Sequence, residues 1–517
     1  MKKNLLFLAV MAISLTQAQV SLVKDINLGS GDGVTDQFVK YNNLILFSGN
    51  NVTDGFELWA SDGTTTGTNF ITSGSSAYNP TRFYYSTSLG EVVYNAGTSN
   101  SLHKTDGTLS GTQIIGTSAL DASDFIDFQN NLYCTSDVFF GRQMSIVLST
   151  GSGLFDAIGT NPDPKGYTEY NGQIYFSAAA ASTNREIWTT DTSSTNAAFL
   201  FFDVNPGSSN SNPKDFTVFN NKLYFTADDG TNGREIWVTD GSSGGTEIVL
   251  DLNSGTADAN PENLTVFNDA LYFTATHPTL GIEIFKMNAA QNITNLKNIA
   301  SETASSFPAD LFVFDGKLYF SADDTINGRE LWSTTGFSLT TNLVKNINTS
   351  SSNPDSNPTG FVSYFDELFF SADNDTNGRE LWKTDGTDAG TVLVSDINTS
   401  GNSNPENLTV VGDNLFFSAT TTATGKELFK YRDPSLSIEN LELEQMFSIY
   451  PNPATHYFSI VTTSEIKNIS VYNLHGKLVK TFEKSQDQYS IKDLTAGLYF
   501  VNISTINGAI TKKVIKE

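Results

Sequence analysis

The sequence predicts an all-β protein: a large β-propeller of about eight or nine four-stranded blades, closed by the N-terminal strand, and a small immunoglobulin-like β-sandwich behind it. Three observations predict this fold. Glu, an aliphatic residue and an aromatic residue recur as a triplet about every 45 to 50 residues, the length of a four-stranded blade. Apolar and polar residues alternate with the period of a strand, and no sustained helical period is present. The repeats stop after Arg432, where the composition changes.

The recurring triplet marks the third strand of each predicted blade. Every tryptophan of the chain closes one copy: Trp59, Trp188, Trp237, Trp332 and Trp382. The clear copies begin at an acidic residue: Glu57, Glu186, Glu235, Glu283, Glu330, Glu380 and Glu427. Two degenerate copies, which begin at Ser101 and Gln143, lie in the long interval between Glu57 and Glu186 and bring the number of copies to nine.

Residues 213–252 show the four strands of one repeat. Phe216–Phe219 and Leu223–Thr226 alternate apolar and polar residues across a short Asn turn, as a hairpin does. Arg234–Val238 is the third strand, and Thr246–Leu250 the fourth. A longer stretch rich in Ser, Asn and Pro then leads to the next repeat.

The ninth copy has no fourth strand after it, and a strand of that pattern stands at the other end of the chain, at Leu22–Ile26. Pairing this strand with the last repeat closes a ring and removes the open sheet edges. Nine blades exceed the typical four to eight. An eight-bladed ring with one degenerate repeat and an open array are therefore alternatives.

Residues 1–18 have the layout of a cleaved secretory signal peptide: Lys2 and Lys3, an apolar run over 5–15, and the small residue Ala18 before Gln19. We therefore predict an exported protein whose repeat region spans 19–432. No later run of about 18 apolar residues offers a transmembrane segment. The single cysteine leaves no intramolecular disulfide, so stability must come from burial.

An acidic linker, 433–446, separates the repeats from a slightly basic region, 447–517, with several short alternating strands. Its motifs follow in order: Tyr450-Pro451-Asn452-Pro453-Ala454, then 471–477 with Gly476, then 494–501 with Gly497, and finally Lys512-Lys513-Val514-Ile515-Lys516. This order resembles the C-terminal sorting domain of the type IX secretion system of Bacteroidetes. The resemblance implies Sec export to the periplasm, contact with the secretion machinery through 447–517, and a product released or fixed to the outer-membrane cell surface.

The segment 380–387, Glu-Leu-Trp-Lys-Thr-Asp-Gly-Thr, resembles the ELWxxDGT repeat family, and the copies near Ser101 and Gln143 depart from that pattern. The family implies no established activity. The formal net charge of −26 would repel nucleic acid and anionic surfaces, which excludes nucleic-acid partners. Solubility or association with cations is the plainer interpretation of this charge, and an extracellular glycan or protein is the expected class of ligand.

One loop has the spacing of a calcium ligand set. Asp373, Asp375 and Asn377 present alternate oxygen ligands before the turn residue Gly378, as calcium loops do. No Glu stands at the usual twelfth place, and a hydrogen-bonded polar turn explains the same residues. Calcium is therefore the only cofactor that the sequence suggests.

The repeated Arg-Glu pairs before the aromatic residue, such as Arg329-Glu330, are interpreted as structural, because an acid present in every blade cannot be a single catalytic acid. A ring of repeats binds its ligand through residues that depart from the repeat pattern, and such residues are concentrated in 77–166. The candidate ligand-binding residues are Tyr84, Tyr85, His103, Lys104 and Arg142, with Tyr94, Phe139 and Phe140 beside them in the sequence. Aromatic and basic side chains suit a glycan or a peptide. Drift in an unconstrained repeat is the alternative.

The sequence favours a non-catalytic binding protein over an enzyme. Only His103 and His277 fall within the repeats, at unmatched positions, which disfavours a zinc site or a Ser-His-Asp arrangement. Paired carboxylates of a polysaccharide-degrading hydrolase or lyase remain an alternative in so acidic a chain. A structural or adhesion protein of the cell surface is the third hypothesis.

Overall fold

The structure is a computed structural model that describes residues 20–72, 78–138, 141–148, 151–154, 162–179, 184–191, 197–433, 448–462, 466–473, 477–482, 486–505 and 508–517. The chain divides into two compact units, with a boundary between Tyr431 and Arg432. In the described residues the regular elements are β-strands and two short 3-10 turns, Ser243–Gly245 and Ser338–Thr340. The predicted signal peptide, 1–18, and most of the predicted linker lie outside the described residues.

Six sheets of the repeat region consist of four consecutive strands each. The first contains β2 (Val34–Tyr41), β3 (Leu44–Asn51), β4 (Gly55–Ser61) and β5 (Asn69–Phe70). The next such sheets contain β13 (Lys165–Tyr170), β14 (Gln173–Ala179), β15 (Arg185–Asp191) and β16 (Ala197–Phe202), and then β17 (Lys214–Phe219), β18 (Lys222–Asp228), β19 (Arg234–Thr239) and β20 (Glu247–Leu250).

The remaining three follow the same plan. They contain β21 (Glu262–Phe267), β22 (Ala270–His277), β23 (Gly281–Asn288) and β24 (Ile293–Lys297); β25 (Ala309–Phe314), β26 (Lys317–Asp323), β27 (Arg329–Thr334) and β28 (Asn342–Lys345); and β29 (Thr359–Tyr364), β30 (Glu367–Asp373), β31 (Arg379–Thr384) and β32 (Val392–Ser395).

One register is common to these sheets. The triplet's tryptophan on the third strand is paired with a phenylalanine on the second, as in Phe225 with Trp237 and Phe320 with Trp332. Where the triplet ends in phenylalanine the pairing is the same, Phe273 with Phe285. Because side chains alternate between the two faces of a strand, this register fixes which face of every sheet carries the aromatic residue.

The second and third repeats share one seven-stranded sheet, which the sequence does not predict. It contains β6 (Thr81–Ser86), β7 (Glu91–Ala96), β8 (Ser101–Thr105), β9 (Gln113–Phe128), β10 (Asn131–Val138), β11 (Gly141–Leu148) and β12 (Gly151–Leu154). The 16-residue β9 pairs with β8 through its first half and with β10 mainly through its second. The usual Ser/Asn/Pro connection between repeats is missing here, so one strand serves both.

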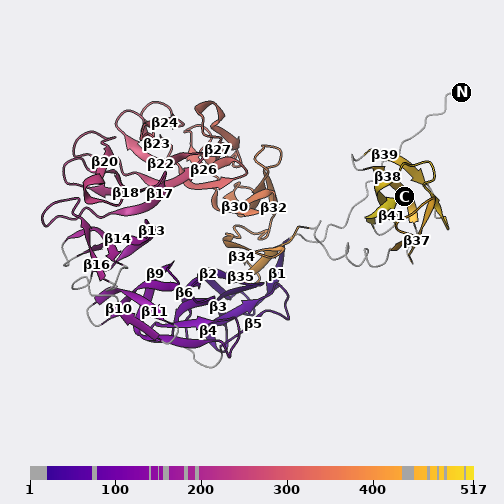
Figure 1. The fold of residues 1–517 in the computed structure, drawn as a ribbon, viewed down its shortest axis with the longest axis horizontal. Helices are drawn as coiled ribbons and strands as arrows, with labels where there is room; N and C mark the ends of the chain where they lie inside the picture. Colours follow the sequence, from indigo (N-terminus) through magenta and orange to yellow (C-terminus); the bar gives the residue numbers. More distant parts are fainter. Residues whose placement is uncertain are drawn as a thin grey trace. The chain divides into compact units, whose positions relative to one another are not determined.

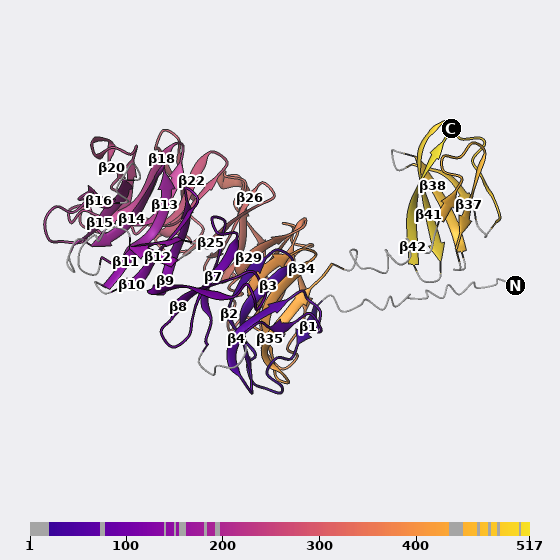
Figure 2. The ribbon, with the colours of Figure 1, turned by 60° about the horizontal axis from the view of Figure 1, so that its bottom comes forward.

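The N-terminal strand β1 (Val20–Lys24) belongs to the sheet of the last repeat. It pairs antiparallel with β35 (Gly425–Tyr431), next to β34 (Asn414–Thr421) and β33 (Glu406–Val411). β1 lies beside β35 in both ribbon views (Figures 1 and 2). The predicted pairing of the N-terminal strand with the last repeat is present.

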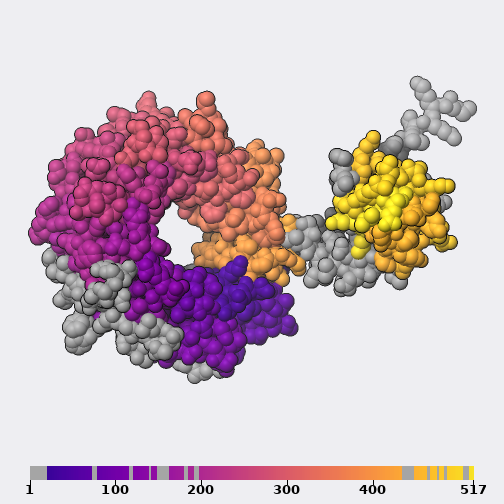
Figure 3. Space-filling model, viewed as in Figure 1, coloured from indigo at the N-terminus to yellow at the C-terminus, as the bar shows by residue number. Residues whose placement is uncertain are grey.

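The core of the repeat region is divided among the seams between successive repeats. In the described residues, nine hydrophobic clusters each combine side chains of two neighbouring repeats. One of them joins Val23 and Leu428 of the last repeat to Phe47 and Trp59 of the first. The repeats follow one another round a central opening in Figure 1, and the space-filling view in Figure 3 shows that side chains leave this opening unfilled.

The C-terminal unit has two sheets on one core. One contains β36 (Ser448–Tyr450), β37 (Tyr457–Val461) and β40 (Tyr489–Ser490), and the other β38 (Ile466–Asn473), β39 (Leu478–Phe482), β41 (Gly497–Thr505) and β42 (Gly508–Lys516). Phe458 and Tyr489 of the first sheet and Val471 and Val501 of the second are buried together. No helix in the described part of the chain is long and apolar enough to cross a membrane.

Candidate binding site

The repeated glutamate binds the leaving connection, which is the chain segment that leads from its own repeat to the next one. The Glu330 carboxylate accepts hydrogen bonds from the N–H groups of Ile347 at 2.9 Å and Asn348 at 3.0 Å, and from the Ser356 hydroxyl at 2.6 Å. Its side chain is fully buried. The same kind of bond from a leaving connection reaches Glu186, Glu235, Glu283, Glu380 and Glu427. These acids are therefore framework groups, in line with the structural interpretation of the triplet.

The arginine before the glutamate binds the entering connection, which is the chain segment that leads from the preceding repeat into the first strand of its own repeat. The Arg329 guanidinium donates to the Phe307 carbonyl at 2.7 Å and to the Ser321 hydroxyl at 3.0 Å. Arg379 donates in the same way to the Asn357 carbonyl at 2.9 Å. Adjacent residues of one strand thus fix the entering and the leaving chain, because their side chains point to opposite faces.

Burial changes the acidity of the repeated glutamates. Desolvation raises the pKa of Glu235, Glu330 and Glu427 to about 7, although the backbone N–H donors oppose the shift. The pKa of Glu186, Glu283 and Glu380 is also raised by burial. Burial in the frame of the repeats accounts for these raised pKa values without any catalytic role.

These shifts predict that the repeat region loses stability as the pH rises. The folded-state pKa of Glu330, about 7, lies above its ordinary value of 4.5, so between these values the folded state binds more protons than the unfolded state. The stabilising contribution is complete below the ordinary pKa and is lost as the pH rises through the folded-state pKa. Calorimetry at pH 5 and pH 8 should show a smaller pH dependence of Tm for Glu330→Gln than for the unsubstituted chain. An unchanged pH dependence would contradict the assignment.

The second and third repeats replace both framework residues of the triplet. By strand register, His103 faces Tyr94 where a tryptophan elsewhere faces phenylalanine, and Ser145 faces Cys134. The glutamate position holds Ser101 in the second repeat and Gln143 in the third. The predicted departures therefore fall at the positions that build the frame of the other repeats.

His103 lies between two tyrosines. Its ring stacks on Tyr94 with centroids 5.4 Å apart and meets Tyr78 edge-on at 5.5 Å. Its Nδ1 is 2.8 Å from the Ser101 carbonyl, and burial lowers the pKa of the imidazole. The ring lines a cavity of about 350 Å³ together with Glu57.

Three other predicted ligand residues make contacts of their own. The Tyr84 hydroxyl donates to Asp127 at 3.2 Å, and Lys104 forms an ion pair with Glu91 at 2.7 Å. Tyr85 is exposed. Tyr84 and Lys104 are thus engaged within the sheet, while the exposed Tyr85 packs its ring against that of Tyr41, with centroids 6.0 Å apart.

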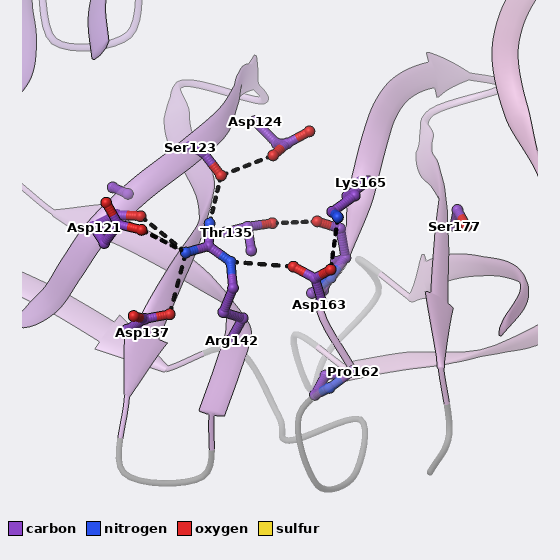
Figure 4. Close-up of polar contacts among 12 residues, drawn as sticks. Asp121, Ser123, Asp124, Thr135, Asp137, Arg142, Pro162, Asp163, Lys165 and Ser177 are labelled. Carbon is purple, nitrogen blue, oxygen red and sulfur yellow. Dashed lines mark hydrogen bonds and ion pairs between the residues drawn. The ribbon is translucent and has the colours of Figure 1, made fainter. Parts of the chain in front are cut away.

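Arg142 is the centre of a network of acids (Figure 4). Its guanidinium forms ion pairs with Asp121 at 3.0 Å, with Asp137 at 3.1 Å and with Asp163 at 3.1 Å. It also donates to the Ser123 hydroxyl at 2.6 Å. Arg142 stands where Arg185, Arg234, Arg329 and Arg379 stand in other repeats and, like them, binds the entering connection, through the Asp121 carbonyl. The structure gives it a framework role.

The five predicted ligand residues do not converge on one site. His103 and Lys104 are neighbours on β8 with side chains on opposite faces, and Arg142 lies on β11. Phe139 and Phe140 lie outside the described residues. What the five share is position in the sequence, which does not bring them together in space.

Sequence reasoning missed a second cavity, of about 500 Å³, between the first and second repeats. Phe56 and Arg82 line it together with Thr35, Gln37, Ser48, Asn79, Pro80 and Thr81. Phe56 occupies the position of the entering-chain arginine, such as Arg234. Alignment of the repeats by strand register shows that Ile282 and Lys426 also replace the arginine at this position, so Phe56 is one of several exceptions to it.

Arg82 is the second exception at this cavity. It stands at a bulge of the first strand, with a φ of 54°, where other repeats have Asp215, Asn263, Asp310, Asn407 or a glycine. Residues such as Asn and Asp tolerate a positive φ better than most others do. An ion pair with Asp121 at 2.8 Å holds the Arg82 guanidinium, whose side chain is 40% exposed.

The predicted calcium ligands are joined by hydrogen bonds of a polar turn. Asp373 accepts from the Asp375 N–H at 2.7 Å, and the Asn377 amide donates to Asp396 at 2.8 Å. Asn374 donates to the Asn377 side chain at 3.0 Å. In the described residues, no three His, Cys, Asp or Glu side chains are grouped as a metal site would need.

Calcium binding at this loop stays a prediction, with a thermal test. If Asp373, Asp375 and Asn377 bind calcium, millimolar CaCl₂ should raise the Tm of the chain, because a ligand of the folded state stabilises it. The rise should vanish with chelator and in Asp375→Asn. Asp324→Asn, in the corresponding loop of the preceding repeat, is the matched control. An equal Tm in calcium and in chelator would leave the hydrogen-bonded turn as the sufficient explanation.

The sorting motifs at the two ends of the C-terminal unit meet in space. The Asn452 amide donates to the Lys513 carbonyl at 2.9 Å, and the Ile515 N–H donates to the Asn452 side-chain oxygen at 2.9 Å. Pro451 and Pro453 flank Asn452, Gly497 begins β41, and Lys512 lies on β42. Gly476 lies outside the described residues. Asn452 therefore ties the Pro-Asn-Pro motif to the last strand.

Two solved structures resemble the chain at low TM-scores. PorZ, an essential bacterial surface component of the type IX secretion system of Porphyromonas gingivalis, matches with a TM-score of 0.36 and 11% identity over 92% of this chain. The chain spans 64% of the length of that protein. The extracellular domain of BT4673 from B. thetaiotaomicron matches with a TM-score of 0.34 and 11% identity, over 95% of this chain and 76% of that one. Likenesses at this level assign no function.

No curated protein matches the chain in sequence. Residues 448–517 match the family model of the secretion system C-terminal sorting domain. The match covers nearly all of the predicted region 447–517 and includes the motifs that resemble such a domain. The C-terminal unit is therefore a sorting domain of the type IX secretion system, and the chain is exported to the cell surface or secreted.

Proposed function

We propose that the repeat region is a nine-bladed β-propeller that binds a glycan outside the cell, without turning it over, at the cavity lined by Phe56 and Arg82. The observation that carries the proposal is the coincidence of two exceptions at one seam. Phe56 replaces a framework arginine, Arg82 replaces a small bulge residue, and both line a cavity of about 500 Å³. A ring of similar repeats gains a specific site where its repetition fails.

The chemistry of the cavity suits a sugar ring. An aromatic face such as that of Phe56 packs against apolar C–H surface, while Gln37, Asn79 and Arg82 offer side chains that hydrogen-bond hydroxyl groups. Binding sites for small ligands combine apolar walls with a few placed polar groups in this way. The net charge of −26 favours neutral glycans over acidic ones, because the protein's field repels anions.

The lining of the cavity supports binding without catalysis, and the sorting domain supports a ligand outside the cell. Glycoside hydrolysis needs a pair of carboxyl groups beside the scissile bond. The described lining residues of this cavity bring no carboxylate, since Arg82, Gln37 and Asn79 are its most polar groups. The sorting domain supports an extracellular ligand, because type IX export delivers the chain to the cell surface or beyond.

An array of plant, algal and bacterial polysaccharides tests the proposal, with bound protein and released reducing sugar read together. The chain should bind one or more neutral polysaccharides and release no sugar. Phe56→Arg and Arg82→Asn each restore the residue type of other repeats, and both should lose binding. Asp215→Asn, at the corresponding bulge of another sheet, is the matched control and should bind normally.

Three outcomes would decide against the proposal. Sugar release would make the protein an enzyme. Equal binding by Phe56→Arg, Arg82→Asn and the unsubstituted chain would place the glycan elsewhere. Absence of both binding and sugar release across the array would favour a protein partner or an adhesive role.

A further inference from the structure

The aromatic position of the second repeat is occupied by a smaller residue. Five repeats have a buried tryptophan at this position, and the second has His103. A cavity of about 350 Å³ lies beside it, lined by Glu57, Thr72, Tyr78, His103, Leu109 and Ile114 among others. Since indole is larger than imidazole, the substitution leaves room that other seams fill with the chain's own side chain.

In two other seams this position holds a pair formed by the chain's own ammonium and indole groups. The Lys24 Nζ lies 5.5 Å from the centroid of the Trp59 ring, and the Lys297 Nζ lies 5.6 Å from that of Trp332. In each pair the lysine ends the fourth strand of one repeat and the tryptophan belongs to the next repeat. In these two seams a lysine ammonium thus lies over the indole ring of the next repeat, attracted by the aromatic face.

The seam between the first and second repeats lacks both partners. Thr72 occupies the position in this seam that Lys24 occupies in its own. The Thr72 hydroxyl accepts a hydrogen bond from the Leu58 N–H at 3.1 Å. Lys24 is paired across its sheet with Leu428, the residue of the last repeat that corresponds to Leu58. His103 replaces the tryptophan. The seam thus lacks both groups, as do the seams that hold Gly116 with Ser145 and Leu250 with Phe285, and here His103 and a buried glutamate line a cavity.

The residues around the cavity are arranged to receive a cation. Glu57, which is 1% exposed, lines the cavity and accepts from the Thr72 hydroxyl at 2.6 Å. The His103 Nδ1 donates to the Ser101 carbonyl at 2.8 Å, so the second nitrogen of the neutral ring is a hydrogen-bond acceptor. The buried wall therefore offers a carboxyl group and an imidazole acceptor to the same cavity.

The rest of the lining combines Tyr78, Leu109 and Ile114 with the polar residues Thr112 and Gln113. The Tyr78 ring meets the His103 ring at 5.5 Å, and its hydroxyl is 2.6 Å from that of Tyr94. Leu109 and Ile114, 66% and 54% exposed, are exposed apolar residues of the lining. Aromatic faces beside a carboxyl group suit an ammonium, and exposed apolar side chains suit a short hydrocarbon stem.

We propose that this cavity binds an organic ammonium group on a short apolar stem, which takes the place of the missing lysine between Glu57, His103 and Tyr78. The cavity is distinct from the glycan site, because Phe56 and Asn79 line that one, whereas their neighbours Glu57 and Tyr78 line this one. The proposal holds whether or not the protein binds glycans. The acidic balance of the chain adds a general attraction for cations.

Titration of the full chain with n-butylammonium chloride, followed by ligand-observed NMR, tests the proposal, with 1-butanol as the neutral comparison. The ammonium should bind and the alcohol should not. His103→Trp fills the cavity with the residue that five repeats have at this position, and Thr72→Lys supplies an ammonium group from the chain itself. Each should weaken binding by at least about tenfold.

Controls separate loss of the site from loss of the fold. His103→Trp and Thr72→Lys should keep the Tm of the chain, since each introduces a residue type that stands at the same position in another repeat. Phe56→Arg, in the glycan cavity, should leave ammonium binding unchanged. No binding of butylammonium, equal binding of butanol, or full binding by both restored variants would each overturn the proposal.

Discussion

Replacing Glu330 with alanine is expected to lower the free energy of unfolding by about 3 kcal/mol or more. The carboxylate is the acceptor for two backbone N–H groups and for the Ser356 hydroxyl, at distances of 2.6 to 3.0 Å. Removing it leaves these buried donors without that acceptor, and an unsatisfied buried donor costs about 1 to 3 kcal/mol. Urea unfolding monitored by tryptophan fluorescence measures the change.

The conservative variant separates the hydrogen bonds from the charge. Glu330→Gln keeps an acceptor oxygen and should cost only about 1 kcal/mol. The chain contains a precedent, because Gln143 occupies the same position in the third repeat and is buried. Glu247→Ala, an exposed glutamate, should change stability by less than about 0.5 kcal/mol. A large loss in Glu330→Gln would show that the charge, and not the acceptor geometry, holds the connection.

Deleting the N-terminal strand is expected to have the largest effect on the repeat region. Removal of residues 20–27 takes away the partner strand of β35 and the N–H groups of Ile26 and Asn27, which donate to Glu427 at 3.1 and 3.0 Å. It also removes Val23 from the cluster that contains Trp59. The loss should exceed about 5 kcal/mol, which single substitutions seldom reach. Calorimetry and light scattering should show a much lower Tm and a loss of the monomer.

A matched truncation controls for shortening the chain. Removal of residues 434–517 leaves β1 and β35 intact and should keep the Tm of the repeat region, since the contacts divide at Tyr431. The exposed edge of β35 explains the expected association of the N-terminal deletion, because unpaired strand edges bind one another. A monomer with normal Tm after deletion of 20–27 would contradict a structural role for the pairing.

Local patterns were sufficient to predict the strands and the place of the N-terminal strand. The alternation in residues such as 216–219 and the turn at Asn220 define a hairpin without any distant contact. The incomplete last repeat left β1 as the natural partner of β35. The shared strand β9 could not be predicted, because it depends on how two worn repeats lie against each other.

The candidate sites were harder to predict than the fold. The sequence indicated the region of exceptions and His103 within it, but not which exceptions lie in one cavity. Arg142 looked exceptional, and its strand register and its contact with the Asp121 carbonyl show that it keeps the framework role of the repeated arginine. Phe56 did not stand out in the sequence, because apolar residues are common in strands. Only the strand register shows that it occupies a position where other repeats have arginine.

Hydrogen–deuterium exchange of the full chain with its strongest-binding array polysaccharide tests most directly the central claim, that exceptions to the repeat form the binding surface. Bound ligand should protect the backbone amides of residues 34–61 and 78–86, which contain Phe56 and Arg82, and leave 214–431 unchanged. Protection spread evenly over the regular repeats, or confined to them, would contradict the claim.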